Sequence, residues 1–221
     1  MKNNLDNLNI SIINCKKCKR LVTFRQKVAN EKRKQYLTEN YWGKPITGFG
    51  DINAKILIVG LAPAAHGANR TGRVFTGDKS SDFLYKCLYK ADISNKEKSE
   101  HKGDNLILKN AYITLALKCL PPKDKPTSNE LKNCFKFFKN EIELLKNLKV
   151  IIALGRIAFD SCVNLFKLDK KKVLFKHGYS YQIDGNLKLK ACYHPSPRNV
   201  NSKIINESKM TEIFLDTKKE L

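Results

Sequence analysis

Residues 55–61 read Lys-Ile-Leu-Ile-Val-Gly-Leu, and this short apolar run, which breaks at Ala62-Pro63, indicates the fold class. Three similar runs follow it: AYITLAL at 111–117, VIIAL at 150–154 and LKLKACY at 187–193. In three of the four runs the apolar residues are continuous rather than alternating, which is typical of parallel strands covered on both faces. The sequence therefore predicts a central four-stranded parallel sheet.

Helical patterns lie between and after these runs. Residues 80–91, 156–168 and 208–219 are candidate helices, and Thr127-Ser-Asn-Glu130 is a capping box that opens another. Strands that alternate with helices predict an α/β fold, a three-layer α/β/α sandwich in which ligands bind beyond the carboxyl ends of the strands. The loops that follow the first, second and fourth apolar runs are therefore expected to carry the site.

The chain is strongly basic. It contains 42 Lys and Arg against 21 Asp and Glu, which gives a formal net charge of +21. Such an excess indicates a polyanionic partner, and nucleic acid, membrane surfaces and ribosomal contacts are all candidates. Biased coding composition explains part of the charge, so the charge alone does not choose among these partners.

The length of 221 residues fits one domain, and we expect residues 1–221 to form it, with a basic helical extension over about residues 1–45. A content of 42% hydrophobic residues excludes wholesale disorder, and no apolar run approaches the roughly 18 residues that span a bilayer. The polar start MKNNLDNLN has no signal-peptide core. We therefore expect a cytoplasmic protein with no membrane partner, and a monomer by default.

Seven cysteines are present, and an odd number in a chain without export features argues against a disulfide framework. Cys15-Lys-Lys-Cys18 has the spacing that lets two thiolates reach one metal from a single turn, and Cys119 and Cys134 lie near Pro121-Pro122. Four thiolates suit zinc and a [4Fe-4S] cluster equally well. On spacing alone, a metal centre and ordinary buried cysteines are equally supported. The other three cysteines are interpreted as core residues: Cys87, Cys162 and Cys192.

Basic side chains surround these cysteines in the sequence, and positive charge favours the thiolate form that binds metals. The basic residues are Lys16, Lys17, Lys19, Arg20 and Lys118. We therefore expect the cysteine thiols beside them to be ionised.

The glycine-rich loop at residues 60–84 joins the first apolar run to the next helix. It reads GLAPAAHGANRTGRVFTGDKSSDFL and contains Gly60, Gly67, Gly72 and Gly77. Such a loop exposes backbone N–H groups at the end of a strand, where they can hold an anion, a carbonyl oxygen or a water. The GxxxxGKS/T and GxGxxG patterns of nucleotide enzymes are absent, so the loop does not indicate a nucleotide phosphate site.

A second loop, His194-Pro-Ser-Pro-Arg-Asn199, comes directly after the fourth apolar run. A lone histidine is more often structural than catalytic. This one lies at the carboxyl end of a predicted strand, beside a rigid proline-rich turn that also carries Arg198. Its position favours a functional role.

Three segments together, GLAPAAHGANRTGRVFTGDKSSDFL, LKCLPPKDKPT and HPSPRN, resemble the type B, or fifth-family, uracil-DNA glycosylases of bacteria and archaea. The resemblance spans nearly the whole chain in the right order. It implies an α/β/α fold with a central four-stranded parallel sheet, and hydrolytic excision of uracil and other deaminated bases from DNA, the first step of base excision repair. It also implies a [4Fe-4S] cluster, whose ligands would be Cys15, Cys18, Cys119 and Cys134.

The resemblance implies two catalytic residues, His194 as the motif histidine and Asp78 as the carboxylate that handles the catalytic water. Asp82 lies one helical turn later and is interpreted as a helix-capping or structural carboxylate. Phe75 resembles the aromatic residue that stacks on the flipped base. The full set of implied substrate-binding residues is Gly60, Leu61, Ala62, Pro63, Ala64, Phe75, Ser196 and Arg198.

Two departures from the family pattern leave the base specificity less defined than the reaction. Leu115 stands where many relatives carry an Asn that reads the uracil edge, and Val200-Asn-Ser-Lys-Ile204 replaces the usual VNTGRL. The alternative hypothesis is a nonenzymatic nucleic-acid-binding protein that a four-cysteine metal centre stabilises. Only the enzyme hypothesis requires His194 and Asp78 to lie beside a base-sized cavity.

Overall fold

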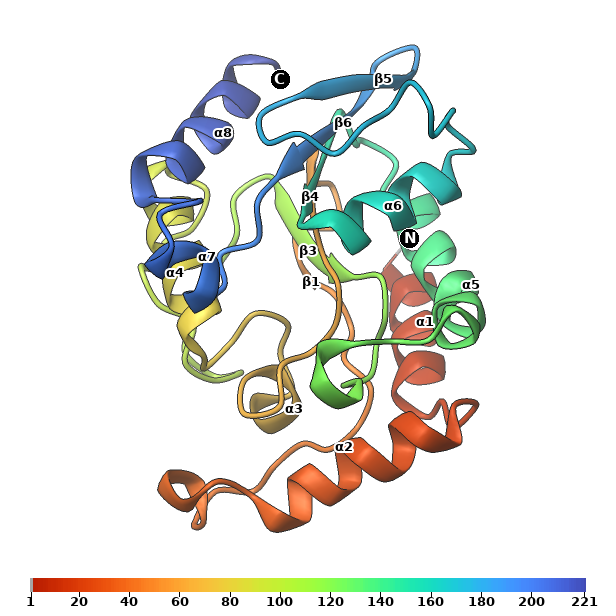
Figure 1. The fold of residues 1–221 in the computed structure, drawn as a ribbon, viewed down its shortest axis with the longest axis vertical. Helices are drawn as coiled ribbons and strands as arrows, with labels where there is room; N and C mark the ends of the chain where they lie inside the picture. Colours follow the sequence, from red (N-terminus) through yellow and green to blue (C-terminus); the bar gives the residue numbers. More distant parts are fainter. Residues whose placement is uncertain (1) are drawn as a thin grey trace.

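Four parallel strands form the centre of the sheet in a computed structural model that describes residues 2–221 (Figure 1). Their order is β3-β2-β4-β6, and every residue of the first three is buried. The predicted parallel sheet is confirmed. The bounds of the four strands are Ile56–Gly60 (β2), Ala111–Leu115 (β3), Val150–Leu154 (β4) and Leu187–Cys192 (β6).

Two antiparallel strands extend this sheet to six, so the prediction of four strands was incomplete. Strand β1 (Phe49–Gly50) pairs with β3 at one edge, and β5 (Ser180–Asp184) pairs with β6 at the other. A pairing of two residues gives no periodicity to detect. Strand β5 alternates between exposed and half-buried residues and carries little apolar side-chain area, so it resembles a surface loop in sequence.

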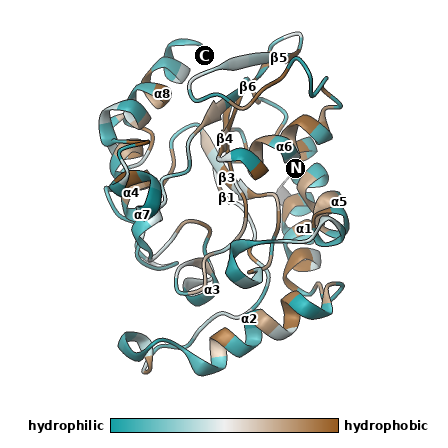
Figure 2. Cartoon of the chain, in the orientation of Figure 1, coloured by the Kyte–Doolittle hydropathy of each residue, from teal (hydrophilic) through white to brown (hydrophobic). Residues whose placement is uncertain are grey.

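Helices cover both faces of the sheet (Figure 1), as the predicted three-layer sandwich requires. Hydrophilic residues lie on their outward surfaces (Figure 2). One face carries α4 (Lys79–Lys90), α7 (Pro197–Asn201) and α8 (Glu207–Lys219). The other carries α1 (Lys2–Ile13), α5 (Ser128–Leu144) and α6 (Arg156–Leu165). One hydrophobic cluster fills the space on each side of the sheet.

The N-terminal extension packs against the outside of these layers. Helix α1 contacts α5, and Arg20 of α2 (Lys19–Glu31) forms an ion pair of 2.7 Å with Glu130 of α5. Three short helical segments complete the elements: η1 (Lys34–Tyr36), α3 (Ala68–Thr71) and η2 (Pro122–Asp124). Within residues 2–221, no helix combines the length and the apolar character that crossing a bilayer requires.

Strand β2 lies between β3 and β4, so the chain leaves β2 toward one side and later returns to its other side. Open α/β sheets bind ligands at such a reversal of strand order, beyond the carboxyl ends of the strands. The loops after β2, β3 and β6 meet there.

Candidate active site and cysteine cavity

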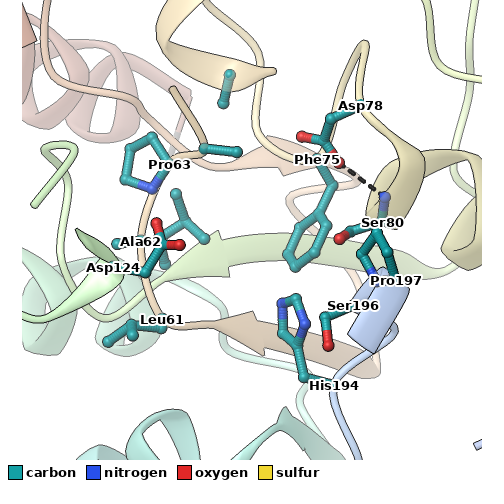
Figure 3. Close-up of a pocket in the computed structure, with 13 residues that line it drawn as sticks. Leu61, Ala62, Pro63, Phe75, Asp78, Ser80, Asp124, His194, Ser196 and Pro197 are labelled. Atoms are coloured by element: carbon teal, nitrogen blue, oxygen red, sulfur yellow. Dashed lines mark hydrogen bonds between the residues drawn. The ribbon is translucent and has the colours of Figure 1, made fainter. Parts of the chain in front are cut away.

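A cavity of about 340 Å³ opens at this reversal point (Figure 3). Its wall comes from the loop after β2, the start of α4, the end of β3, η2 and the loop after β6. The lining residues are Leu61, Ala62, Pro63, Ala64, Ala68, Phe75, Asp78, Ser80, Leu115, Asp124, His194, Ser196 and Pro197. The structure therefore brings together the two loops that the sequence singled out.

Phe75 forms an aromatic wall of this cavity. Its ring centroid lies 6.0 Å from that of His194, and the two rings are tilted by 34°. The backbone of Phe75 has φ +44°, a value that non-glycine residues rarely adopt. Gly60 does not line the cavity as predicted; a Cβ there would lie 2.6 Å from the Phe75 ring. Gly60 thus contributes by leaving room for that ring.

His194 follows β6, and its ring projects into the cavity (Figure 3). In the described part of the chain neither ring nitrogen has a hydrogen-bond partner. Burial lowers the pKa of His194 to about 4, so the imidazole is neutral at neutral pH. Asn199 holds the loop in place because its Nδ2 donates to the His194 carbonyl oxygen at 2.9 Å. The neutral ring can donate one hydrogen bond to a ligand in the cavity.

Asp78 is the N-cap of α4. Its Oδ1 accepts hydrogen bonds from the backbone N–H groups of Ser80 and Ser81, at 2.9 and 3.0 Å. The Asp78 backbone N–H donates in turn to Ser81 Oγ at 3.0 Å, which completes a capping box. Oδ2 lies against Gly67, where a Cβ would be only 1.8 Å away. Burial raises the pKa of Asp78, and the two N–H groups oppose that effect. One carboxylate oxygen is fixed by the helix, and the other is left for a ligand or a water.

The helix-capping role expected for Asp82 therefore belongs to Asp78. Asp82 lies in the first turn of α4 and lines a separate hollow with Lys79 and Lys98. Sequence reasoning misassigned the cap because an aspartate suits both the N-cap and the first turn of a helix.

Ser196 lines the cavity and caps α7, since its Oγ accepts from the Asn199 N–H at 3.3 Å. Arg198 was predicted to bind substrate but is exposed on α7 and does not line the cavity. The proline at position 197 starts a helical turn, and this turn carries the next side chain away from the cavity.

Five lining residues were absent from the predicted set: Ala68, Ser80, Leu115, Asp124 and Pro197. Ser80 and Ala68 fall within the quoted glycine-rich loop, but small residues there carry no distinctive signal. Asp124 comes from η2, with φ +54°, and its carboxylate has no hydrogen-bond or ion-pair partner within residues 2–221. The Pro121-Pro122 pair marked a turn at this place but not its direction.

The four predicted ligand cysteines surround a second, smaller cavity. Cys15, Cys18, Cys119 and Cys134 line it together with apolar side chains, including Leu21, Leu117 and Phe137. Two sulfur atoms accept hydrogen bonds: the Lys118 backbone N–H donates to Cys134 Sγ at 3.2 Å, and Asn133 Nδ2 donates to Cys18 Sγ at 3.5 Å. The remaining cysteines are buried, as predicted.

Burial opposes the expected ionisation at two of the four predicted ligand thiols. Burial raises the pKa of Cys119 to about 12 and that of Cys134 to about 11. Arg25 and Lys118 act in the opposite direction but do not outweigh desolvation. Arg20 is engaged by Glu130 instead. Binding a metal here would therefore have to displace protons from neutral thiols.

The donor set is chemically suited to an iron-sulfur cluster, because four cysteine thiols line one cavity. Within the described residues, no group of three or more His, Cys, Asp or Glu side chains is arranged to hold one metal ion. A single zinc draws four sulfurs to about 2.3 Å from one point, whereas each thiolate of a [4Fe-4S] cluster takes a different iron.

The two cavities share a wall. Ala62 lines the larger cavity and packs against the apolar cluster that contains Cys18, Cys119 and Cys134. Leu115 lines the larger cavity, and Cys119, four residues later, lines the smaller one.

The fold and the larger cavity define a class of DNA-repair enzyme. Residues 47–218 match the uracil DNA glycosylase superfamily, and the chain belongs to that superfamily. It is 43% identical over 205 residues to the Type-5 uracil-DNA glycosylase of Thermus thermophilus, covering 93% of each chain. The corresponding values are 40% over 203 residues for the Type-5 enzyme of Pyrobaculum aerophilum (92% of this chain, 87% of that one) and 39% over 214 residues for that of Mycobacterium leprae (96% and 93%). The resemblance to the fifth family is confirmed.

Proposed function

We propose that this protein is a DNA glycosylase that flips uracil, and other deaminated bases, out of DNA and hydrolyses the N-glycosidic bond in base excision repair. The observation that carries the proposal is the cavity in which Phe75, His194 and Asp78 meet. An aromatic wall, a neutral hydrogen-bond donor and a carboxylate with one free oxygen are the groups that this reaction requires. The Type-5 uracil-DNA glycosylase relatives, similar over nearly the full chain, support the same reaction.

The base must first leave the duplex, because its glycosidic bond is inaccessible in the stack, and unstacking costs a few kcal/mol. Stacking on Phe75 and contacts between basic side chains and phosphates offset that cost. The 62–65 turn offers backbone N–H groups to the base at the opposite side of the cavity. These contacts hold the base and leave the sugar C1′ at the mouth of the cavity.

Bond cleavage places positive charge on the sugar and negative charge on the departing base. His194 donates a hydrogen bond to the base O2 and so stabilises the developing anion. The free oxygen of Asp78 orients a water toward C1′ and favours the cationic sugar. The water gives its hydroxyl group to C1′, and its proton ends on the released base.

The assay that tests this function uses DNA with a single uracil, followed by alkaline cleavage of the abasic strand. We expect excision by the wild-type protein and a loss of about 100- to 1000-fold in the single-turnover rate for His194→Ala, with nearly unchanged DNA affinity. His101→Ala is the matched control, because His101 is exposed and lies outside the cavity. No excision by the wild-type protein would favour the nonenzymatic binding protein. Equal rates for both variants would remove His194 from catalysis.

We further propose that Cys15, Cys18, Cys119 and Cys134 hold a [4Fe-4S] cluster. Support comes from the cavity that the four thiols line together. When bound, the cluster would tie the segment before α2 to the loop after β3.

Protein purified without oxygen should be brown, with about four irons and four sulfides per chain. Cys119→Ser should lower the iron content, whereas Cys162→Ala, at a buried cysteine on α6, should not. A colourless protein with stoichiometric zinc would contradict the proposal.

We also infer that the protein works as a monomer in the cytoplasm, on DNA and without a membrane partner. All seven cysteines are free, which suits a reducing compartment. Light scattering on the cluster-loaded protein, with and without DNA, tests the monomer; a dimer mass at working concentrations would refute it.

A further inference from the structure

We propose that Arg73 and Asp104 form a buried clamp that positions Phe75 as the stacking wall of the base cavity. The proposal rests on the function proposed above for Phe75. Neither clamp residue lines the cavity, so both act through the aromatic ring. They are positioning residues rather than catalytic ones.

The clamp links two segments that are far apart in the sequence. Arg73 Nη1 donates to Asp104 Oδ1 at 2.8 Å, and Nη2 donates to the other oxygen of the same carboxylate and to Ser99 Oγ, the latter at 2.7 Å. Asp104 also accepts the backbone N–H groups of Glu100 and Leu106, at 2.9 and 3.0 Å. The carboxylate is therefore fixed by its own loop before it meets Arg73.

The Arg73 guanidinium also binds Thr76, the residue that follows Phe75. Arg73 Nε donates to Thr76 Oγ1 at 3.0 Å, and that hydroxyl lies 2.6 Å from Ser99 Oγ. The Gly77 N–H donates to the Ser99 carbonyl oxygen at 2.9 Å. Phe75 thus lies between anchored residues on both sides.

Anchoring at both sides is what the conformation of Phe75 requires. A non-glycine residue at φ +44° is strained and persists only where its surroundings impose it. If the clamp opens, the backbone can relax to negative φ, and the ring then leaves its place between Gly60 and His194. Water has little access to these hydrogen bonds, since Thr76 and Ser99 are fully buried and Arg73 is 5% exposed.

A need for stability alone does not account for this choice of residues. A buried ion pair is weak evidence for stability, because apolar residues of similar volume often serve as well. A bidentate guanidinium fixes the orientation of the groups that it joins, since its donors have a fixed geometry. That directional property is the one that holding a strained turn requires.

The test is a double-mutant cycle on single-turnover uracil excision at saturating enzyme, well below the melting temperature. Arg73→Lys keeps the charge but loses the fork, and we expect it to slow excision by about 10- to 100-fold, the range in which displaced groups cost catalysis. In the Phe75→Ala background the same change should cost less than about 3-fold, because the ring it positions is gone. Lys190→Met is the control: it breaks the ion pair between a buried lysine and Glu220, and should lower the melting temperature without changing the rate in either background.

Equal effects of Arg73→Lys in both backgrounds would overturn the clamp while leaving the role of Phe75 intact. A Phe75→Ala variant as fast as the wild type would overturn both assignments. Where Arg73→Lys does not fold, Ser99→Ala replaces it, since this change removes hydrogen bonds without leaving a charge unpaired, and the same non-additivity is expected.

Discussion

Asp78 combines a structural and a chemical task on different oxygens. Oδ1 caps α4, and Oδ2 has no hydrogen-bond partner within residues 2–221. Asparagine caps helices about as well as aspartate, so Asp78→Asn should leave the melting temperature almost unchanged. It loses the charge that favours a cationic sugar and should slow single-turnover excision by about 100-fold or more. Calorimetry and quenched-flow kinetics on one preparation measure both quantities.

Asp78→Ala is the informative companion, because it removes the cap as well. We expect it to lose stability by about 1 kcal/mol and to be as slow as Asp78→Asn. An asparagine variant as fast as the wild type would mean that Asp78 only caps the helix.

The low pKa of His194 sets the pH dependence of the reaction. A pKa of about 4 in place of 6.5 means that the ring stays neutral as the pH falls from 8 through 6.5. The single-turnover rate should therefore be flat from pH 8 to about pH 5.5, with no inflection near 6.5. An inflection near 6.5 that disappears in the His194→Ala variant would show that the ring works in its charged form.

The same pKa shift makes His194 a source of acid sensitivity. Between pH 6.5 and about 4 the unfolded chain binds a proton at this position that the folded chain does not. The stability that depends on the neutral ring is therefore complete above pH 6.5 and is lost as the pH falls toward 4. Urea titrations of His194→Ala should show a smaller loss over this interval than the wild-type protein does.

Leu115 lines the base cavity at a place where a polar side chain could read the base edge. An aliphatic group discriminates mainly by shape, so the wild-type enzyme should also excise hypoxanthine and other deaminated bases. Leu115→Asn should narrow this range by at least about 10-fold in favour of uracil. Relative kcat/KM values on oligonucleotides that differ only at the damaged base measure the effect. If the wild-type protein excises only uracil, then groups other than the Leu115 side chain recognise the edge of the base.

At the scale of elements, the buried strands and the amphipathic helices were predictable because their patterns come from burial. Strand β6 shows the limit: its sequence alternates with lysine, and Lys190 is nevertheless 4% exposed because Glu220 pairs with it at 2.7 Å. The edge strands were not predictable, since their pairing depends on neighbours distant in the sequence. Local pattern therefore defined the layers but not the width of the sheet.

The candidate site was predictable where a motif concentrates it and not where tertiary contacts build it. Phe75, Asp78 and His194 follow from two loops of the sequence. The approach of Asp124 does not, since it depends on how the loop between two cysteines folds back over the cavity. Nor does the exclusion of Arg198, which depends on the direction of one short helix.

An ion pair between Arg20 and Glu130 joins helices α2 and α5, and the charge of Glu130 can be removed with little other change. Glu130 completes the capping box with Thr127 and accepts two hydrogen bonds from Arg20, whose proximity lowers the pKa of Glu130. Glutamine also suits a capping box, so Glu130→Gln loses mainly the ion pair. The melting temperature should fall by a few degrees, and the difference should shrink in high salt.

The sign of the pH effect follows from the lowered pKa. The stabilisation by Glu130 is complete above its ordinary value of 4.5 and is lost as the pH falls below it. The difference in melting temperature between the variant and the wild type should therefore shrink progressively as the pH falls below 4.5. If the difference in melting temperature persists at low pH, the lower stability of the variant comes from altered packing and not from the lost ion pair.

For the whole molecule, the net charge of +21 predicts strongly salt-dependent DNA binding. Each phosphate contact releases counterions, so a footprint of about six phosphates should weaken binding about 1000-fold between roughly 50 and 200 mM salt. Fluorescence anisotropy with a uracil-free duplex isolates this term. An affinity that does not change over this range would mean that the positive charge reflects sequence composition and does not contribute to DNA binding.

The wall shared by the two cavities has a consequence for engineering the enzyme. Residues 115–124 contribute Leu115 and Asp124 to one cavity and Cys119 to the other. With Cys119 as a ligand of the proposed cluster, a library that randomises this whole segment in search of new base preferences should lose most members to failed assembly of that cluster, whatever their fit to the base. Selection campaigns should instead hold 116–121 constant and diversify the two flanking positions together, so that each survivor reports on recognition alone.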